Sequence, residues 1–233
     1  MSLIGQSVKR LEDRPLLTGS GRFAADNTPP DALYLRVVRS PIAFGRLTGI
    51  RVAEALAHPG TVAVWTARDV AEIPPISLRM PPTLGLEAYR QPILADGHVR
   101  YVGEPIAAVF AIDPYSAEDI AERVAPEIEP LAPCVDPVAL PTEVAPGLST
   151  EVAVITKTYG DRDSAFARAH AVVSLELTVG RHSGVPLETR GAIAVPEAES
   201  GILRFYGAAK VPHYNRQALA AMGSRCYRRD GGL

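Results

Sequence analysis

The chain has 233 residues, of which 47% are hydrophobic, and 24 basic residues nearly balance 26 acidic ones to give a formal net charge of −2. A chain of this length forms one or two domains and can bury a sizeable core without a disulfide or a structural metal. The balanced charge argues against nucleic acid as a partner, because nucleic-acid-binding domains concentrate Lys and Arg on one face.

The two cysteines, Cys134 and Cys226, lie far apart and form no C-x-x-C pair. Their spacing argues against an iron–sulfur cluster or a structural zinc site built from the chain's own thiolates, and it suits a reducing compartment. The first fifteen residues include a charge at Lys9 and no apolar stretch of signal-peptide length. The longest apolar run, Ile106 to Ile112, is far shorter than the ~20 residues that span a bilayer. We therefore expect a soluble, cytoplasmic protein that does not bind membranes.

The first half of the chain is rich in strand patterns. Residues that favour β-structure predict strands at 33–38, 61–65 and 127–131, and a short strand is expected at 99–102. The continuously apolar run 106–112 predicts a strand that is buried on both faces.

Helices are expected at 51–56 and 114–125 in the same half. The second helix is well marked, because Asp113 suits the N-cap and a proline follows at the first helical position. A short helical turn is expected near 67–71, and the proline-rich stretch 73–92 predicts a long loop of the kind that is usually functional or interfacial. Strands and helices together place this part of the chain in the α+β class.

The second half begins with prolines among small residues at 130–146, which predict a linker. At 171–179 apolar and polar residues alternate, which is typical of a half-buried strand. The other elements expected here are a helix at 162–170 capped by Asp161, strands at 192–195 and 202–206, and a helix that begins near Pro212.

The residues by themselves indicate no firm catalytic site. Gly19-Ser20-Gly21 predicts a structural turn rather than a phosphate cradle, since it does not lead from a strand into a helix. Glu104 stands between a glycine and a proline just before the buried strand, and we interpret it as structural. The five histidines show no spacing typical of a metal site, and surface or loop positions explain them better: His58, His98, His170, His182 and His213.

Several short patterns, taken in order, resemble the large subunits of molybdenum hydroxylases, the family of xanthine dehydrogenase, aldehyde oxidase and carbon monoxide dehydrogenase. The patterns are RLED at 10–13, LLTGSGRF at 16–23, LYLRVVRSP at 33–41, HPG at 58–60 with VAVWT at 62–66 and DV at 69–70, VRYVGEP at 99–105 with AAV at 107–109, AED at 117–119, EPL at 129–131, GD at 160–161 with AF at 165–166, and PLETRG at 186–191. Each pattern alone is weak, and their common order makes the resemblance specific over about residues 4–222.

The resemblance implies an α/β-hammerhead domain at 4–140, a linker at 141–158 and the incomplete start of a molybdopterin-binding α+β domain at 159–222. It implies a molybdopterin cytosine dinucleotide cofactor that carries molybdenum. It also implies hydroxylation of an aldehyde, a purine, another N-heterocycle or a similar small substrate with oxygen from water. The electrons then pass to 2Fe-2S and FAD groups on partner subunits.

One departure from the family pattern lies in the segment from Gly207 to His213. Family members usually carry Gln where this chain has Lys210, and that Gln donates a hydrogen bond to an oxo ligand of the metal. A lysine can also donate, but its positive charge would alter the electronics of the centre. Lys210 is therefore the candidate cofactor-binding residue, the alternative being an ordinary lysine before a helix, and it argues against a standard oxidiser of xanthine or carbon monoxide.

A second departure is the atypical tail at 223–233, which we interpret as the result of a frameshift or gene split near Met222. The family's glycine-rich loop and catalytic glutamate lie beyond the residues present, so the catalytic residue is unknown here. We expect an inactive isolated chain whose partners are the remainder of the large subunit, an iron–sulfur subunit and an FAD subunit. The alternative, favoured by the ragged terminus, is a stand-alone hammerhead domain for assembly or binding, or a decayed fragment. The strands expected after residue 159 favour the enzymatic interpretation, because they need a partner core.

Overall fold

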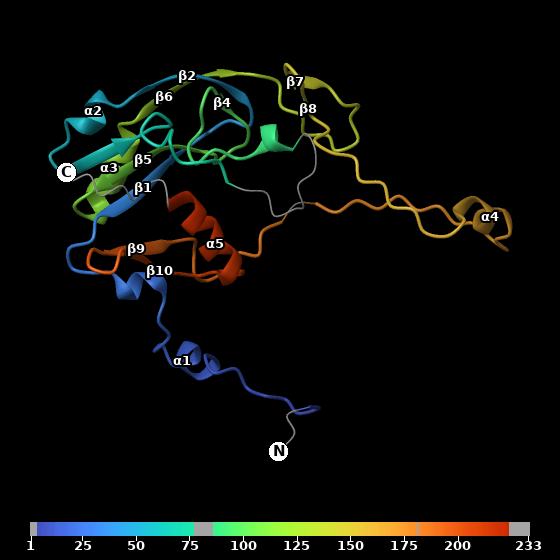
Figure 1. The fold of residues 1–233 in the computed structure, drawn as a ribbon, viewed down its shortest axis with the longest axis horizontal. Coiled ribbons are helices and arrows are strands. Elements are labelled where there is room, and N and C mark those ends of the chain that lie inside the picture. Colours follow the sequence, from blue (N-terminus) through green and yellow to red (C-terminus); the bar gives the residue numbers. More distant parts are fainter. Residues whose placement is uncertain (1–3, 77–85, 181, 224–233) are drawn as a thin grey trace. The chain divides into compact units, whose positions relative to one another are not determined.

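The computed structural model describes residues 4–76, 86–180 and 182–223 (Figure 1). These residues form two compact units. The larger unit contains residues 33–76, 86–179 and 213–223, whereas the smaller unit joins residues 4–32 to residues 180 and 182–212. The smaller unit is therefore built from two segments that are far apart in the sequence.

The larger unit contains two three-stranded antiparallel sheets. In the first sheet β5 (Pro105–Ala111) lies between β1 (Tyr34–Arg39) and β3 (Thr61–Trp65). The second sheet has β2 at its centre, and its strands are β4 (His98–Val99), β2 (Gly45–Arg51) and β6 (Ala125–Pro130).

Short helices and a hairpin complete the larger unit. They are α2 (Ala53–Leu56), η2 (Glu87–Tyr89), α3 (Pro114–Glu122), the hairpin of β7 (Glu143–Ala145) with β8 (Leu148–Ser149), α4 (Arg162–Ala167) and α5 (Pro212–Gly223), whose first residue belongs to the smaller unit. Among the helices of the described ranges, none is long and apolar enough to cross a membrane.

The position of β5 between two strands explains its continuously apolar sequence. Helix α3 lies against one face of β5 (Figure 1). The side chains on this face pack in a cluster of Ala55, Ala107, Val109, Ala111, Ala117, Ile120 and Val124. On the other face Ile106 packs with Ala95 and Val99. The strand is thus buried on both faces, as its sequence predicts.

Helix α3 begins where its capping residues predict. The carboxylate of Asp113 accepts hydrogen bonds from the backbone N–H groups of Tyr115 and Ser116, both at 2.9 Å. The hydroxyl of Ser116 also donates to this carboxylate, and these hydrogen bonds hold the pKa of Asp113 below its usual range. The cap satisfies amides that have no partner inside the helix.

Strand β2 was not predicted, because its sequence GRLTGIR contains two glycines and little alternation. Its partner β6 lies about eighty residues further along the chain, and ion pairs of Arg46 with Glu129 and of Arg51 with Glu127 cross the two strands. Gly45 is required here, because a Cβ on it would lie 2.6 Å from Cγ2 of Ile128 and 2.8 Å from the backbone oxygen of Glu129.

Three further predictions differ from the structure. Residues 67–71 form turns without helix, and the stretch 130–146 expected as a linker includes β7. Residues 171–179 form no strand: Leu175 and Leu177 are 79% and 83% exposed, and no described segment pairs with them. An alternating sequence becomes a stable strand only when a neighbour satisfies its backbone and covers its apolar face.

The smaller unit contains α1 (Asp13–Leu17), η1 (Ala24–Asn27), β9 (Ala192–Glu197) and β10 (Ile202–Gly207). The two strands form an antiparallel hairpin, which confirms the strands predicted near 192–195 and 202–206. At the turn of this hairpin Arg204 and Ser200 donate hydrogen bonds to Glu197, and the bond from Arg204 in particular keeps the pKa of Glu197 low. The segment Gly19-Ser20-Gly21 follows α1 as a turn, as predicted, with Gly19 at φ 73°.

Candidate functional site

Lys210, the candidate cofactor contact, lies in the turn after β10. It comes three residues after Gly207, and α5 begins two residues later. Its side chain is exposed, and it has no hydrogen-bond or ion-pair partner in the part of the chain that the structure describes. The ammonium group can therefore donate up to three hydrogen bonds to another group.

A close backbone contact places the PLETRG segment beside the start of this turn. Gly207 pairs with Ala192, the first residue of β9. A Cβ on Gly207 would lie 2.7 Å from the carbonyl oxygen of Gly191, which is closer than side chains allow. The backbone of PLETRG (186–191) therefore ends directly against the residue from which the Lys210 turn starts.

The N-terminal segment reaches the same region. The carboxylate of Glu188 accepts a hydrogen bond of 3.0 Å from the backbone N–H of Ala24, 164 residues earlier. Helix η1, which begins at Ala24, lies against β9 and β10. Three segments that resemble the family pattern are thus gathered in the smaller unit.

The exposed Lys210 side chain could contact the organic part of an anionic, oxygen-rich cofactor. Lys210 offers an unpaired ammonium group as a hydrogen-bond donor, and its positive charge complements such a group. Within the described ranges no cluster of three or more His, Cys, Asp or Glu side chains could hold a metal ion.

Glu104 has a structural position in the larger unit. Its backbone oxygen accepts from the N–H of Ser40 at 2.9 Å, while the N–H of Gly103 donates to the oxygen of Ser40 at 2.8 Å. Its buried carboxylate accepts from the backbone N–H of Arg100 and, at 2.9 Å, from the Arg100 guanidinium. These bonds join the patterns LYLRVVRSP and VRYVGEP, and they support the structural interpretation of Glu104.

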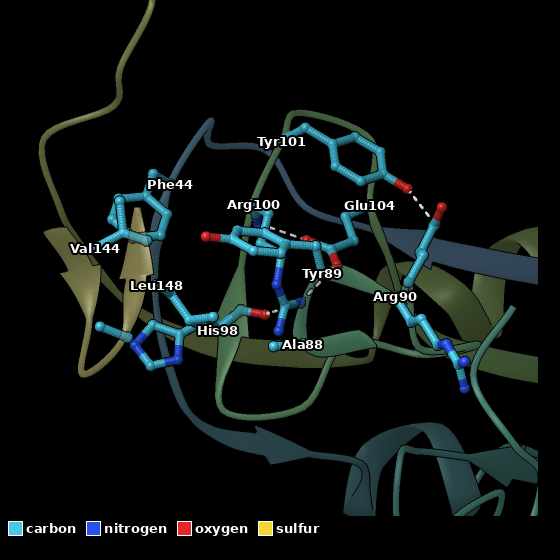
Figure 2. Close-up of a pocket in the computed structure, with 12 residues that line it drawn as sticks. Phe44, Ala88, Tyr89, Arg90, His98, Arg100, Tyr101, Glu104, Val144 and Leu148 are labelled. Atoms are coloured by element: carbon cyan, nitrogen blue, oxygen red, sulfur yellow. Dashed lines mark hydrogen bonds and ion pairs between the residues drawn. The ribbon is translucent and has the colours of Figure 1, made fainter. Parts of the chain in front are cut away.

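A pocket of about 350 Å³ opens beside this pair. Figure 2 shows Tyr89 and Arg100 in the middle of the labelled residues, with the guanidinium of Arg90 directed away from the other labelled side chains. Its lining combines aromatic, charged and small apolar residues: Phe44, Ala88, Tyr89, Arg90, Gln91, His98, Arg100, Tyr101, Glu104, Val144, Ala145 and Leu148.

Several polar groups of the pocket take part in hydrogen bonds within the chain. The hydroxyl of Tyr89 accepts from the N–H of Ser149 at 2.8 Å and donates to its carbonyl oxygen at 3.2 Å, which fastens the β7–β8 hairpin to η2. Gln91 donates to the hydroxyl of Tyr101 at 2.6 Å. Arg100 is held by Glu104 and by the carbonyl of His98. The hydrogen bonds of Tyr89 therefore join the hairpin to η2 at this pocket.

The structure brings together residues that sequence reasoning kept apart. The partner of Glu188 lies 164 residues away, so no local spacing could indicate its contact with Ala24. Tyr89 fell within a predicted loop, and its aromatic character in a proline-rich segment was the only available signal. Among the histidines, Nδ1 of His58 accepts from Gly60 N–H in a turn and His98 stacks on Phe44.

Comparisons with known proteins agree with this arrangement. Residues 18–132 match the family model described as the a/b hammerhead domain of aldehyde oxidase and xanthine dehydrogenase. Residues 144–224 match the model of a molybdopterin cofactor-binding domain. The two models follow each other in the order that the sequence patterns indicate.

Individual proteins with similar sequences or structures point to the same family. The gamma subunit of the 6-hydroxypseudooxynicotine dehydrogenase complex of Paenarthrobacter nicotinovorans is 41% identical over 229 residues, which cover 94% of this chain and 28% of the relative. The large subunit of nicotine 6-hydroxylase from the same organism is 35% identical, with 94% and 27% covered. Quinoline 2-oxidoreductase of Pseudomonas putida 86 superimposes with a TM-score of 0.75 at 33% identity, over 96% of this chain and 29% of that chain.

These findings define a chain of mixed α and β structure in which a hammerhead domain precedes a molybdopterin cofactor-binding domain. The chain belongs to the aldehyde oxidase and xanthine dehydrogenase family and corresponds to an N-terminal part of a molybdenum hydroxylase large subunit. It spans less than a third of the length of the relatives described above.

Proposed function

We propose that this chain provides the hammerhead domain and the first part of the cofactor-binding domain of a molybdenum-dependent hydroxylase. The observation that carries the proposal is the consecutive match of residues 18–132 and 144–224 to the two domain models. The convergence of PLETRG, the N-terminal segment and the Lys210 turn in the smaller unit supports it. In the proposal the hammerhead domain spans 4–140, the linker 141–158, the cofactor-binding part 159–222 and the tail 223–233.

Lys210 is the proposed contact to the cofactor, a molybdopterin cytosine dinucleotide. When bound, such a group supplies a two-electron oxidation of the substrate with oxygen taken from water. The Lys210 ammonium would donate a hydrogen bond to an oxygen of the group and add a positive charge there. Lys210→Gln keeps a donor without the charge, and Lys210→Met removes both while keeping the length of the side chain.

The proposed substrate is a small N-heterocyclic compound. Three similar proteins have names that refer to nicotine, a hydroxylated nicotine derivative or quinoline. Aldehyde oxidases match at lower identity, 26% for the rabbit protein, so the aldehyde is the less favoured class.

The proposed partners are the remainder of the large subunit, an iron–sulfur subunit with 2Fe-2S clusters and an FAD subunit, which together pass electrons to an acceptor. The names of similar proteins as a gamma subunit and a large subunit support a multi-subunit assembly. The exposed apolar side chains at 171–179 suit a chain that needs further protein to cover it. The cytoplasm is the proposed compartment, because the exposed Cys134 is a free thiol.

Co-production of the chain with these partners tests the proposal. We expect dye reduction with an N-heterocyclic substrate by the assembled complex and none by the isolated chain. Turnover by the isolated chain would refute its inactivity. A well-folded chain that binds neither the large-subunit remainder nor molybdopterin would instead support the stand-alone hammerhead module.

The role of Lys210 is tested in the active complex. Lys210→Gln and Lys210→Met should change the electron paramagnetic resonance signal of the molybdenum.

A further inference from the structure

Three segments meet at the end of the β9–β10 hairpin that is opposite its turn. They are the N-terminal arm (residues 18–28), PLETRG (186–191) and the Lys210 turn (207–210). The geometry points to Glu188 as a positioning residue: its hydrogen bond to the arm fixes PLETRG and, through it, the turn that carries Lys210. This inference relies on the proposed function only for the role of Lys210 as a cofactor contact.

The first link is the hydrogen bond between the arm and Glu188. Ala24 is the first residue of η1, and the first amides of a helix have no partner inside it. The Ala24 N–H donates to the Glu188 carboxylate at 3.0 Å, whereas the N–H of the preceding Phe23 donates to Asp26 at 2.7 Å. A hydrogen bond to an ionised acceptor is stronger than a neutral one.

The second link joins PLETRG to the Lys210 turn through backbone atoms. Gly191 ends PLETRG, and its carbonyl lies where a side chain on Gly207 would collide with it. A shift of PLETRG toward the hairpin would therefore displace Gly207, and Lys210 follows three residues later. Backbone-to-backbone packing of this kind cannot be absorbed by the rotation of a side chain.

The other end of the hairpin is held independently. Ser200 and Arg204 both donate hydrogen bonds to the carboxylate of Glu197 beside the turn at 197–201. Loss of the Glu188 contact should therefore loosen the end that carries Lys210 and leave the two strands paired. This difference separates a positioning role from a general loss of folding.

The experiment compares four variants of the full chain without cofactor. Glu188→Ala removes the acceptor, and Glu188→Gln retains a carbonyl acceptor. Glu199→Ala is the matched control, since Glu199 is exposed in the turn of the same hairpin. Ala24→Pro removes only the donor: proline suits the first helical position, and the preceding Phe23 is already extended at φ −105° and ψ 172°.

The readout uses the small number of lysines in the chain. There are three, Lys9, Lys157 and Lys210, so reductive ¹³C-methylation gives few signals, and Lys210→Arg assigns the one of interest. Hydrogen exchange of the Ala24 amide reports the contact itself. We expect Glu188→Ala to accelerate this exchange by about tenfold, because the Ala24 amide loses one charge-assisted hydrogen bond. It should also shift and sharpen the Lys210 signal.

The signal of Lys157, in the larger unit, should stay unchanged in every variant. Ala24→Pro should reproduce the Lys210 change, whereas Glu188→Gln should largely restore the native signal and Glu199→Ala should leave it unaltered. Faster Ala24 exchange with an unmoved Lys210 signal would overturn the positioning role. Unchanged Ala24 exchange in Glu188→Ala would overturn the contact. Neither result depends on whether a cofactor binds Lys210, so these measurements test the positioning role separately from the proposed function.

Discussion

The ion pair between Arg100 and Glu104 joins an exposed guanidinium to a buried carboxylate at 2.9 Å; their side chains are 47% and 2% exposed. A buried acceptor that loses its donors costs more than an exposed cation that loses its acceptor. Glu104→Ala should therefore lower the free energy of unfolding by about 1–3 kcal/mol, because it leaves the Arg100 backbone N–H without its partner. Arg100→Ala should cost less. Urea unfolding followed by the fluorescence of Trp65, the only tryptophan in the sequence, measures both, and a larger cost for Arg100→Ala would contradict this account.

The buried faces of β5 predict a second pair of effects. Ile106 is fully buried, whereas Ile112, just after the same strand, is 61% exposed. Ile106→Ala should lower the free energy of unfolding by about 2–5 kcal/mol, since it removes buried methyl groups and leaves a cavity. Ile112→Ala is the matched control and should change it little. Equal effects of the two substitutions in urea unfolding would show that β5 is not the centre of the core.

The cap of α3 predicts a dependence on pH. Hydrogen bonds from Ser116 and Tyr115 lower the pKa of Asp113 from its ordinary 3.8 in the folded state. The stabilisation is therefore complete above pH 3.8 and is lost as the pH falls below it through the folded-state pKa. The stability difference between native protein and Asp113→Ala should be constant near neutral pH and shrink in acid. Asp119→Asn, on the exposed side of the same helix, should show no such loss; a constant difference for Asp113→Ala down to strongly acid pH would contradict the cap.

The close approach of Gly207 to Gly191 predicts a local effect of a single methyl group. Gly207→Ala would place Cβ 2.7 Å from a backbone oxygen, so the hairpin end must open. We expect a local cost of about 1–3 kcal/mol, visible as faster hydrogen exchange in β9 and β10. Gly180→Ala is the control, because nothing lies within 4 Å of its new Cβ. Protection that is equal in the two variants would mean that the strands tolerate the added atom.

The segment 171–179, which pairs with no described strand, should accept charged substitutions without loss of stability. Leu175 and Leu177 are largely exposed, so the double substitution Leu175→Lys and Leu177→Lys should leave the unfolding midpoint of the isolated chain unchanged and raise its solubility. The same double substitution should weaken co-purification with the large-subunit remainder. A drop in the unfolding midpoint would show that these leucines are packed within this chain.

Local patterns predicted the fold where the information was local. Asp113 and Asp161 mark helix starts, and the apolar run of β5 indicates a strand buried on both faces. Strand β2 was not predicted, because its partner β6 lies far along the chain. The strand expected at 171–179 is absent because a pattern cannot supply the neighbour that it needs. At the candidate site, Lys210 was singled out by resemblance, whereas the contact between Glu188 and Ala24 depends on chain topology alone.

The most direct test of the central claim is the molybdenum and pterin content of this chain after purification from its native host, together with every polypeptide that accompanies it. We expect near-stoichiometric molybdenum and pterin together with an additional large polypeptide that completes the subunit. Purified chain with neither molybdenum nor a partner would contradict the proposal that it works as part of a molybdenum hydroxylase, and would leave the family likeness as ancestry alone.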